Sequence, residues 1–423
     1  MDAAHSLDPL VLVGVAAMLV VAKLCGELFE RRGQPAVLGE LLGGMLLAAL
    51  ALAGVGAFAS LKTDVVIDAL AQIGVIILLF EVGLESDLRE MLQVGATALL
   101  VAAAGTVASF ALGWGAAALF LPEAPRLTQL FVGAALTATS VGITARVLRD
   151  AGKLQTRTAR TILGAAIIDD VIGLVVLAVM KGAVESAGAG GGVSVAGVAI
   201  VALKAVAFLV GAVLVGRLVV PQLFRGAGRL EGRGVLLALS VSICFALAWA
   251  AAAVGLAAII GAFAAGLLLE EAHFEKLPHH TKHDLVELLA PVSQLLVPIF
   301  FVLVGLRVDL RIFTRASALA FALVLTLAAV LGKQACALAV WGRGTNRVAI
   351  GIGMIPRGEV SLIYAGLGAT LLVANAAGTP SSVVSPDTYG AIVATVLLTT
   401  LATPPALKWA MARGDNSKRQ HDE

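Results

Sequence analysis

Two adjacent aspartates, Asp169 and Asp170, lie in the middle of an apolar run, Ile167–Leu174. Successive residues of a helix point about 100° apart, so the two carboxylates cannot share one helix face. One can meet a neighbouring helix while the other faces a water-filled cavity. Repulsion and burial both oppose a doubly charged pair, and we expect at least one aspartate to exchange protons near physiological pH. Lys333 lies equally deep in a later apolar run and needs an anionic partner, for which either aspartate is a candidate.

Two other stretches combine polar residues with weak helix formers. Leu136–Gly142 reads Leu-Thr-Ala-Thr-Ser-Val-Gly, and Met354–Glu359 reads Met-Ile-Pro-Arg-Gly-Glu. Pro removes a backbone donor and Gly loosens a helix, so we expect breaks here. Arg357 and Glu359 are predicted to be a structural charge pair that compensates the exposed backbone and half-helix dipoles. Three hydroxyl residues in the first stretch are candidates to bind a hard cation such as Na⁺, or else to bond back to their own helix: Thr137, Thr139 and Ser140.

The elements that carry these residues are predicted to be membrane helices. The chain has 423 residues, of which 59% are hydrophobic and 14% charged, whereas soluble proteins carry about 25% charged residues. This composition excludes a soluble enzyme, and no basic tract indicates binding to nucleic acid. A charge at the bilayer centre costs at least about 2.5–3.5 kcal/mol, which makes the intramembrane charges the functional candidates. The three cysteines lie in apolar runs and predict no disulfide framework, and we expect no cofactor.

Hydropathy predicts an all-α polytopic membrane protein with thirteen segments. They fall at 9–29, 35–54, 66–84, 96–121, 128–148, 160–182, 194–220, 234–254, 257–270, 288–306, 317–341, 348–372 and 387–411. Most Lys and Arg residues between them gather on one side, apart from a cluster at 307–315. The positive-inside rule then predicts an external N-terminus and a cytoplasmic C-terminus.

A sequence repeat relates the two halves of the chain. Val82–Leu88 (Val-Gly-Leu-Glu-Ser-Asp-Leu) matches Val304–Leu310 (Val-Gly-Leu-Arg-Val-Asp-Leu), and the same offset relates Gly39 to Gly261. The copies are seven segments apart and face opposite sides, which is typical of the inverted-topology repeats of secondary transporters. Segments one to six would pair with segments eight to thirteen. The repeat predicts a substrate site at the midplane, where segments five and twelve are broken.

Together these residues resemble the bacterial monovalent cation:proton antiporters, and in particular the sodium/proton antiporters of the NapA/NhaA-like fold. The motifs are Phe80–Leu88, Leu136–Thr144, Met354–Leu362, the aspartate pair and Lys333, and the resemblance covers essentially the whole chain. It implies about 13 transmembrane helices in two inverted-topology repeats, with two crossing discontinuous helices. It also implies a homodimer, embedded in membrane lipid, that works by elevator-like alternating access.

The resemblance further implies a division of the chain by role. Dimerisation-domain helices would occupy 1–92 in the first repeat and 227–312 in the second, and the core helices that carry out transport would occupy 93–184 and 313–411. A connecting helix would span 185–226, and 412–423 would form a cytoplasmic tail, which we expect to be disordered because it is short and polar.

In antiporters of this kind the second aspartate binds the ion, which here implies Na⁺ at Asp170. The first aspartate forms a salt bridge with the lysine, here Asp169 with Lys333. The resemblance implies electrogenic exchange of two protons for one Na⁺ across the bacterial cytoplasmic (inner) membrane, with Li⁺ as a second candidate cation. The substrates would be Na⁺ and H⁺, and protons and Na⁺ would compete for Asp170.

Other interpretations stay open. K⁺/H⁺ exchange keeps the fold and changes the ion, because cavity size and ligand number decide ion choice. A carrier of an organic anion would favour helix N-termini and Asn or Ser donors over a carboxylate pair. An intramembrane aspartyl protease needs two aspartates that converge across helices, whereas adjacent residues diverge. A passive channel would not need the buried pair.

Three weaker features carry ionisable side chains. Glu40 and Glu81 are expected near helix ends or facing the protein interior. The loop His279–His283 contains ligand-like residues without the spacing of a metal site. It is expected to be a solvated surface, with cytoplasmic pH sensing as the alternative.

Overall fold

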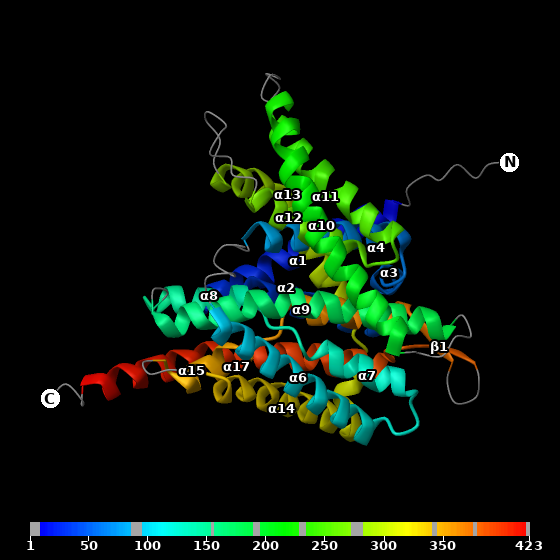
Figure 1. Ribbon diagram of the computed structural model, residues 1–423. Coiled ribbons are helices and arrows are strands. Elements are labelled where there is room, and N and C mark those ends of the chain that lie inside the picture. Colours follow the sequence, from blue (N-terminus) through cyan, green and yellow to red (C-terminus); the bar gives the residue numbers. More distant parts are fainter. Residues whose placement is uncertain are drawn as a thin grey trace. The chain divides into compact units, whose positions relative to one another are not determined.

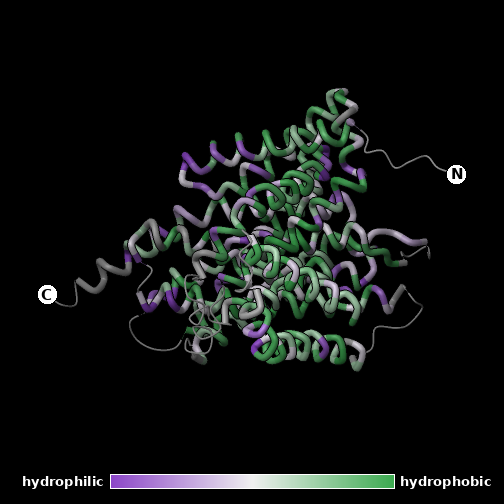
Figure 2. Tube along the Cα trace, turned by 90° about the horizontal axis from the view of Figure 1, so that it is seen from above, coloured by the Kyte–Doolittle hydropathy of each residue, from purple (hydrophilic) through white to green (hydrophobic). Residues whose placement is uncertain are grey.

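The computed structural model describes residues 9–85, 95–153, 156–188, 195–227, 234–271, 282–340, 345–374 and 379–419. In these parts the chain forms helices joined by short turns, with one small hairpin (Figure 1). Nine helices in the described parts are long and apolar enough to cross a membrane, and two shorter apolar helices accompany them. Hydrophobic residues line most of the length of the helices (Figure 2). The predicted helical membrane fold is confirmed.

Each predicted segment coincides with one helix or with the two halves of a broken helix, while the number and direction of membrane crossings remain predictions. The helices before the middle of the chain are α1 (Pro9–Glu30), α2 (Ala36–Leu52), α3 (Gly56–Ser60), α4 (Val65–Glu85), α6 (Gly95–Phe120), α7 (Arg126–Ala135), α8 (Val141–Asp150) and α9 (Arg157–Gly188). The later helices are α10 (Val195–Ala227), α11 (Val235–Ala253), α12 (Ala258–Glu271), α13 (Lys282–Leu306), the 3-10 turn η2 (Leu310–Thr314), α14 (Ala316–Leu338), α15 (Arg347–Gly353), α16 (Glu359–Thr370) and α17 (Pro386–Arg419).

Three local features differ from the sequence-based expectation. Helix α13 begins at Lys282, six residues before the predicted segment, and so takes in the end of the His279–His283 loop, the rest of which lies outside the described residues. A two-stranded antiparallel sheet, β1 (Leu372–Ala374) with β2 (Pro380–Ser382), follows α16. Short hairpins of this kind have little periodicity to reveal them.

The tail was also wrongly predicted to be disordered, as far as residue 419. Helix α17 continues past the apolar segment to Arg419. Three strong helix formers, Ala410, Met411 and Ala412, lead into this extension, and the Arg413 guanidinium stacks over the Trp409 ring at 4.2 Å. The Asn346 side-chain amide donates a hydrogen bond to the carbonyl of Ala410 over 2.8 Å. Residues 420–423 lie outside the described residues.

The chain divides into two compact units. Unit 1 is Met1–Leu88 with Leu203–Leu310, and unit 2 is Arg89–Ala202 with Arg311–Glu423. Each unit therefore combines a piece of each half of the chain, as two interleaved repeats would. Helix α10 is shared between the units.

In unit 1 the sequence repeat corresponds to a structural repeat. Several glycines lie so close to a backbone carbonyl of another helix that a Cβ atom would overlap it, and four of these contacts form two pairs related by the repeat. These contacts are Gly44 with Val302, Gly266 with Phe80, Gly83 with Phe263, and Gly305 with Leu41. The repeat offset relates Gly44 to Gly266 and Val302 to Phe80, so the first contact and the second are equivalent in the two halves. The other two contacts are related to each other in the same way. The repeated glycines therefore let α2 pack on α13, and α4 pack on α12, through their backbones.

Unit 2 is built around α6, α9, α14 and α17, with the broken pairs α7/α8 and α15/α16 packed against them. An apolar cluster joins these helices, and its buried members include Val101, Ile162, Cys336, Ile350 and Leu407. The aspartate pair, Lys333, Arg357 and Glu359 lie within this unit, whereas Glu40 and Glu81 lie in unit 1.

Candidate functional site

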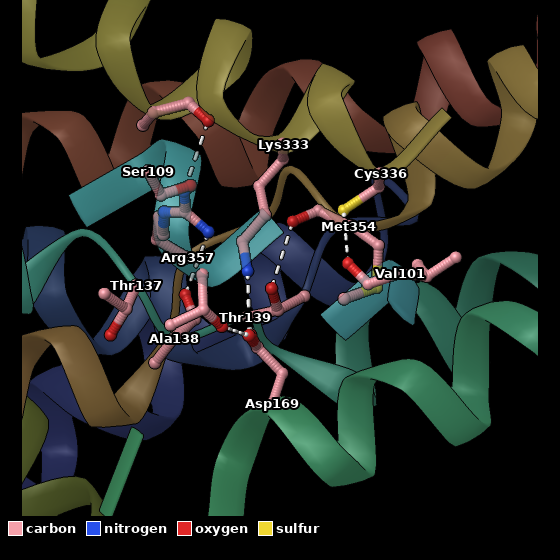
Figure 3. A network of polar contacts seen from close by, with 12 residues as sticks. Val101, Ser109, Thr137, Ala138, Thr139, Asp169, Lys333, Cys336, Met354 and Arg357 are labelled. Carbon is pink, nitrogen blue, oxygen red and sulfur yellow. Dashed lines mark hydrogen bonds and ion pairs between the residues drawn. The ribbon is translucent and has the colours of Figure 1, made fainter. Parts of the chain in front are cut away.

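Asp169 of α9 and Lys333 of α14 form a fully buried ion pair. The Lys333 Nζ lies 2.9 and 3.0 Å from the two carboxylate oxygens, and neither side chain is exposed (Figure 3). Thr106 of α6 donates a hydrogen bond to Asp169 Oδ1 over 2.7 Å. Three helices thus converge on one carboxylate. Of the two candidate partners for Lys333, the structure pairs Asp169 with it.

Asp170 has a different environment from its neighbour. It is 2% exposed, and its Oδ1 has no hydrogen-bond partner among the described residues. It interacts electrostatically with two like charges, Glu359 and Asp169, and with Lys333. A buried oxygen without a partner costs about 1–3 kcal/mol, and more when it is charged. A proton or a cation bound at Asp170 would offset that cost.

Both expected helix breaks are present, and they contact each other. The first separates α7 from α8 at 136–140, and the second separates α15 from α16 at 354–358. The Ser140 N–H donates to the carbonyl of Pro356 over 2.8 Å, and the Thr139 hydroxyl donates to the carbonyl of Met354 over 3.1 Å. Gly358 lies so near Ser140 that an added Cβ would come within 2.7 Å of its side chain. The first break therefore supplies donors for carbonyls that the second leaves without helical partners.

Arg357 connects the two breaks to α6 and α14. It is 1% exposed. Its Nη1 donates to the carbonyl of Ala138 over 2.9 Å, and its Nη2 donates to the Ser109 hydroxyl over 3.3 Å and to the carbonyl of Ala329 over 3.2 Å (Figure 3). One guanidinium thus contacts the first break, α6 and α14, and the planar group with its five donors suits this role.

The other predicted site residues separate into two groups. Ser140 donates a hydrogen bond to Glu359 Oε2 over 3.3 Å, so both join the contact between the breaks, together with Thr139. Thr137 instead bonds back to the carbonyl of Ala134 over 2.8 Å, which is the local alternative considered for it. Arg357 and Glu359 flank Gly358 and contact different partners. The role of Thr139 and Ser140 as cation ligands remains a prediction.

Several hydroxyl residues around the charges were missed by the sequence analysis. Thr106 and Ser109 of α6 contact Asp169 and Arg357, as given above. The Thr399 hydroxyl accepts the Arg357 N–H over 3.3 Å, and the Thr400 hydroxyl donates to the Arg357 carbonyl over 2.6 Å. Their only signal was a hydroxyl within an apolar helix. Most helical Ser and Thr residues bond to their own backbone, so that signal does not identify a partner on another helix.

The site offers an exchangeable carboxylate beside an ion pair that can be broken. In the described parts of the chain, no group of three or more His, Cys, Asp and Glu side chains could hold a metal ion. A cation at Asp170 would therefore complete its ligands with hydroxyl, carbonyl or water oxygens, which hard cations accept. Such a site can bind a proton or a monovalent cation in turn.

Comparison with known proteins gives a consistent result. A family model described as the transmembrane sodium/hydrogen exchanger matches residues 16–413. The chain is 38% identical to the high-affinity Na⁺/H⁺ antiporter NhaS3 of Synechocystis, over 97% of this chain and 92% of that protein. It is 32% identical to the Na⁺/H⁺-K⁺ antiporter GerN of Bacillus cereus, over 96% and 97%. The fold is similar to that of the sodium proton antiporter MjNhaP1 of Methanocaldococcus jannaschii, with a TM-score of 0.68 and 17% identity over 95% and 96% of the two chains.

Proposed function

Because the chain belongs to the transmembrane sodium/hydrogen exchanger family, we propose that it is a secondary active antiporter that exchanges Na⁺ for H⁺. The observation that carries the proposal is the contrast within the aspartate pair. Asp169 is held by Lys333 and Thr106, whereas a buried oxygen of Asp170 is left without a hydrogen bond. Asp170 is thus the carboxylate available to bind the transported ion.

The mechanism is competition between H⁺ and Na⁺ for Asp170. An uncompensated carboxylate is costly to move through a low-dielectric barrier. The site therefore crosses when Asp170 carries either ion, and an empty, charged site does not cross. Each crossing with Na⁺ is balanced by a return with H⁺, which couples the two fluxes.

Lys333 provides the second exchangeable proton. Na⁺ that draws Asp169 into its ligand set breaks the Asp169–Lys333 pair, and a buried Lys333 without its anionic partner releases its proton. Two protons then exchange for one Na⁺, and the cycle carries net charge. Thr106 holds Asp169 in place while its partner changes.

The two compact units are assigned different roles in this proposal. Unit 2, with the site, is the mobile transport body, and unit 1 is the dimerisation scaffold of a homodimer that works by elevator-like alternating access. The glycine contacts of unit 1 support a rigid scaffold, since backbones packed this closely have little room to slide. The protein lies in the bacterial inner membrane, with its N-terminus outside and its C-terminus in the cytoplasm.

K⁺/H⁺ exchange is the second candidate. A specific observation favours keeping it, because the relative GerN is described as a Na⁺/H⁺-K⁺ antiporter and is 32% identical. The two candidates share the fold and Asp170, and they differ in the cation that the same oxygens accept.

Transport in proteoliposomes tests the proposal. Purified protein is reconstituted, a pH gradient is imposed, and lumenal pH is followed while Na⁺, Li⁺ or K⁺ is added. A parallel series uses valinomycin with K⁺ to clamp the membrane potential. Dissipation of the gradient by Na⁺, at a rate that the clamp changes, is the expected result. If K⁺ dissipates the gradient as fast as Na⁺ or faster, the transported cation is K⁺ and the assignment of Na⁺ is wrong. If no cation dissipates the gradient, the antiport proposal is wrong.

A further inference from the structure

A polar cavity lies wholly within unit 1. It has a volume of about 450 Å³ and is lined by the last turns of α1, the start of α2 and the middle of α13. Its lining residues are Ala22, Lys23, Gly26, Glu27, Glu30, Ala36, Glu40, Ser293, Gln294, Val297 and Pro298. Small-molecule sites typically occupy about 300–1,000 Å³ and combine apolar walls with a few polar groups. This cavity has both features.

Glu40 is the buried polar group of this cavity. It is 8% exposed, and the described residues give it neither a hydrogen bond nor a close ion pair. Its electrostatic neighbours are Lys23, which attracts it, and Glu30, which repels it. Nearly all buried polar groups in folded proteins have a partner, and a donor that enters the cavity can supply the hydrogen bond that the described residues do not give Glu40.

Ser293 shows which kind of ligand would fit. Its hydroxyl donates its only proton to Glu81 Oε2 over 2.6 Å. Toward the cavity the Ser293 oxygen can therefore only accept a hydrogen bond. The two buried polar side chains of the cavity, Glu40 and Ser293, thus both present acceptors. A ligand that satisfies them carries N–H or O–H donors and a positive charge.

The rim of the cavity favours a ligand that also has an apolar part. Lys23, Glu27 and Glu30 are exposed on α1, and two exposed apolar residues of the same helix, Leu24 and Leu28, lie beside them. A bare alkali ion would leave most of the cavity unfilled, whereas an organic amine supplies both the donors and an apolar body.

We infer that this cavity binds the ammonium group of an organic amine, with Glu40 as its counter-ion and Ser293 as a second acceptor. The amine comes either from a lipid headgroup, whose chains would lie along Leu24 and Leu28, or from a soluble compound. The inference does not rest on the proposed antiport function, because all of its residues lie in unit 1.

Thermal unfolding of the full-length protein in phosphatidylcholine nanodiscs tests the inference. Ethylammonium chloride and tetramethylammonium chloride are titrated at equal ionic strength without Na⁺, and tryptophan fluorescence reports the midpoint. We expect a saturable rise with ethylammonium and none with tetramethylammonium, which has no N–H to donate. Glu40→Gln is expected to weaken the apparent affinity at least tenfold. Asp68→Asn, which removes a unit 1 carboxylate that pairs with Arg307 and does not line the cavity, is the matched control and should stay within twofold of wild type.

Gly26→Ala keeps the inference testable if Glu40→Gln does not fold. A Cβ at Gly26 would lie 3.8 Å from the Glu40 Cγ, an ordinary contact that reduces the space beside the carboxylate and leaves the charges unchanged. It is expected to weaken ethylammonium binding several-fold. Absence of a shift, equal shifts in wild type and Glu40→Gln, or equal effects of both amines would overturn the inference.

The source of the amine is settled by changing the lipid. A midpoint that rises in nanodiscs containing phosphatidylethanolamine, in wild type and not in Glu40→Gln, identifies a lipid headgroup. A response to free ethylammonium alone identifies a soluble amine. Either result supports the site.

Discussion

The helices of the two units are held together by different kinds of contact. Unit 1 packs backbone against backbone through paired glycines, and its ion pair between Arg307 and Asp68, at 2.7 Å, stays about one-third exposed. Unit 2 buries Asp169, Lys333 and Arg357 almost completely within hydrogen bonds from several helices. Close backbone packing holds the helices in place and leaves little room for side chains to change position. A hydrogen-bonded charge network can instead exchange partners, which suits it to an ion that binds and leaves.

The largest expected effect comes from replacing Asp170, whose buried Oδ1 has no hydrogen-bond partner among the described residues. Asp170→Asn keeps the shape but cannot bind a cation through charge, so Na⁺-dependent proton flux in proteoliposomes should fall at least about 100-fold, or about 2.7 kcal/mol. Asp387→Asn is the matched control, because Asp387 pairs with Arg315 on the surface of the same unit. Exchange that survives in Asp170→Asn would remove Asp170 from the ion site.

Breaking the buried pair should destabilise unit 2 more than any surface change. Lys333→Ala leaves Asp169 charged and buried without its partner, which costs about 3–5 kcal/mol. Thermal unfolding measures the loss, and proton flux under a potential clamp measures the predicted change in electrogenicity. Adding Asp169→Asn should restore part of the stability. A double variant no more stable than Lys333→Ala would show that the two residues are not coupled.

Thr106→Val tests whether the network extends beyond the ion pair. Valine has nearly the shape of threonine but donates no hydrogen bond to Asp169, and a bond to a charged group contributes about 1.5–3 kcal/mol. Thr161→Val is the matched control, since Thr161 is equally buried, at 7% exposure, but bonds to the carbonyl of Arg157 in its own helix. We expect a lower unfolding midpoint and a displaced pH profile of transport for Thr106→Val alone. Equal effects of both substitutions would show that Thr106 contributes through packing and not through its hydrogen bond to Asp169.

The stability of unit 1 should be sensitive to added side-chain volume, whereas that of unit 2 is sensitive to the loss of a charge. Gly44→Ala places a Cβ on the carbonyl of Val302 and should cost about 1–3 kcal/mol of unfolding free energy. Gly266→Ala, its counterpart in the repeat, should cost a similar amount. Gly211→Ala, in α10 with open space around it, is expected to be neutral or slightly stabilising. A neutral Gly44→Ala would contradict the account of backbone packing in unit 1.

The structural role of a residue could be predicted from the sequence where its chemistry allows few alternatives. A lysine deep in an apolar helix needs an anion, and Pro356 followed two residues later by Gly358 weakens a helix. The pairing with an aspartate and the second break therefore followed from chemistry. The glycine offset likewise indicated a repeat that the unit 1 contacts reproduce.

The partners of common residues were not predictable. Nothing in the sequence distinguishes Thr106 from Thr161, because the difference lies in which helix each one faces. The choice of Asp169 over Asp170 by Lys333 depends on the rotation of α9, which hydropathy leaves undetermined. The carbonyls bound by Arg357 belong to residues with apolar side chains, so no side-chain pattern could point to them.

The three contacts of Arg357 also couple the local stability of distant segments. Its guanidinium joins the break before α8 to α6 and α14. Local unfolding of any one of these elements would leave the buried Arg357 guanidinium without a hydrogen-bond partner. Unfolding one element alone therefore has a high free-energy cost. Amide protons in the three should therefore exchange with solvent at a common rate, as one cooperative block. The broken helices, although their own backbone ladders are interrupted, would then be as slow to exchange as the unbroken helices beside them.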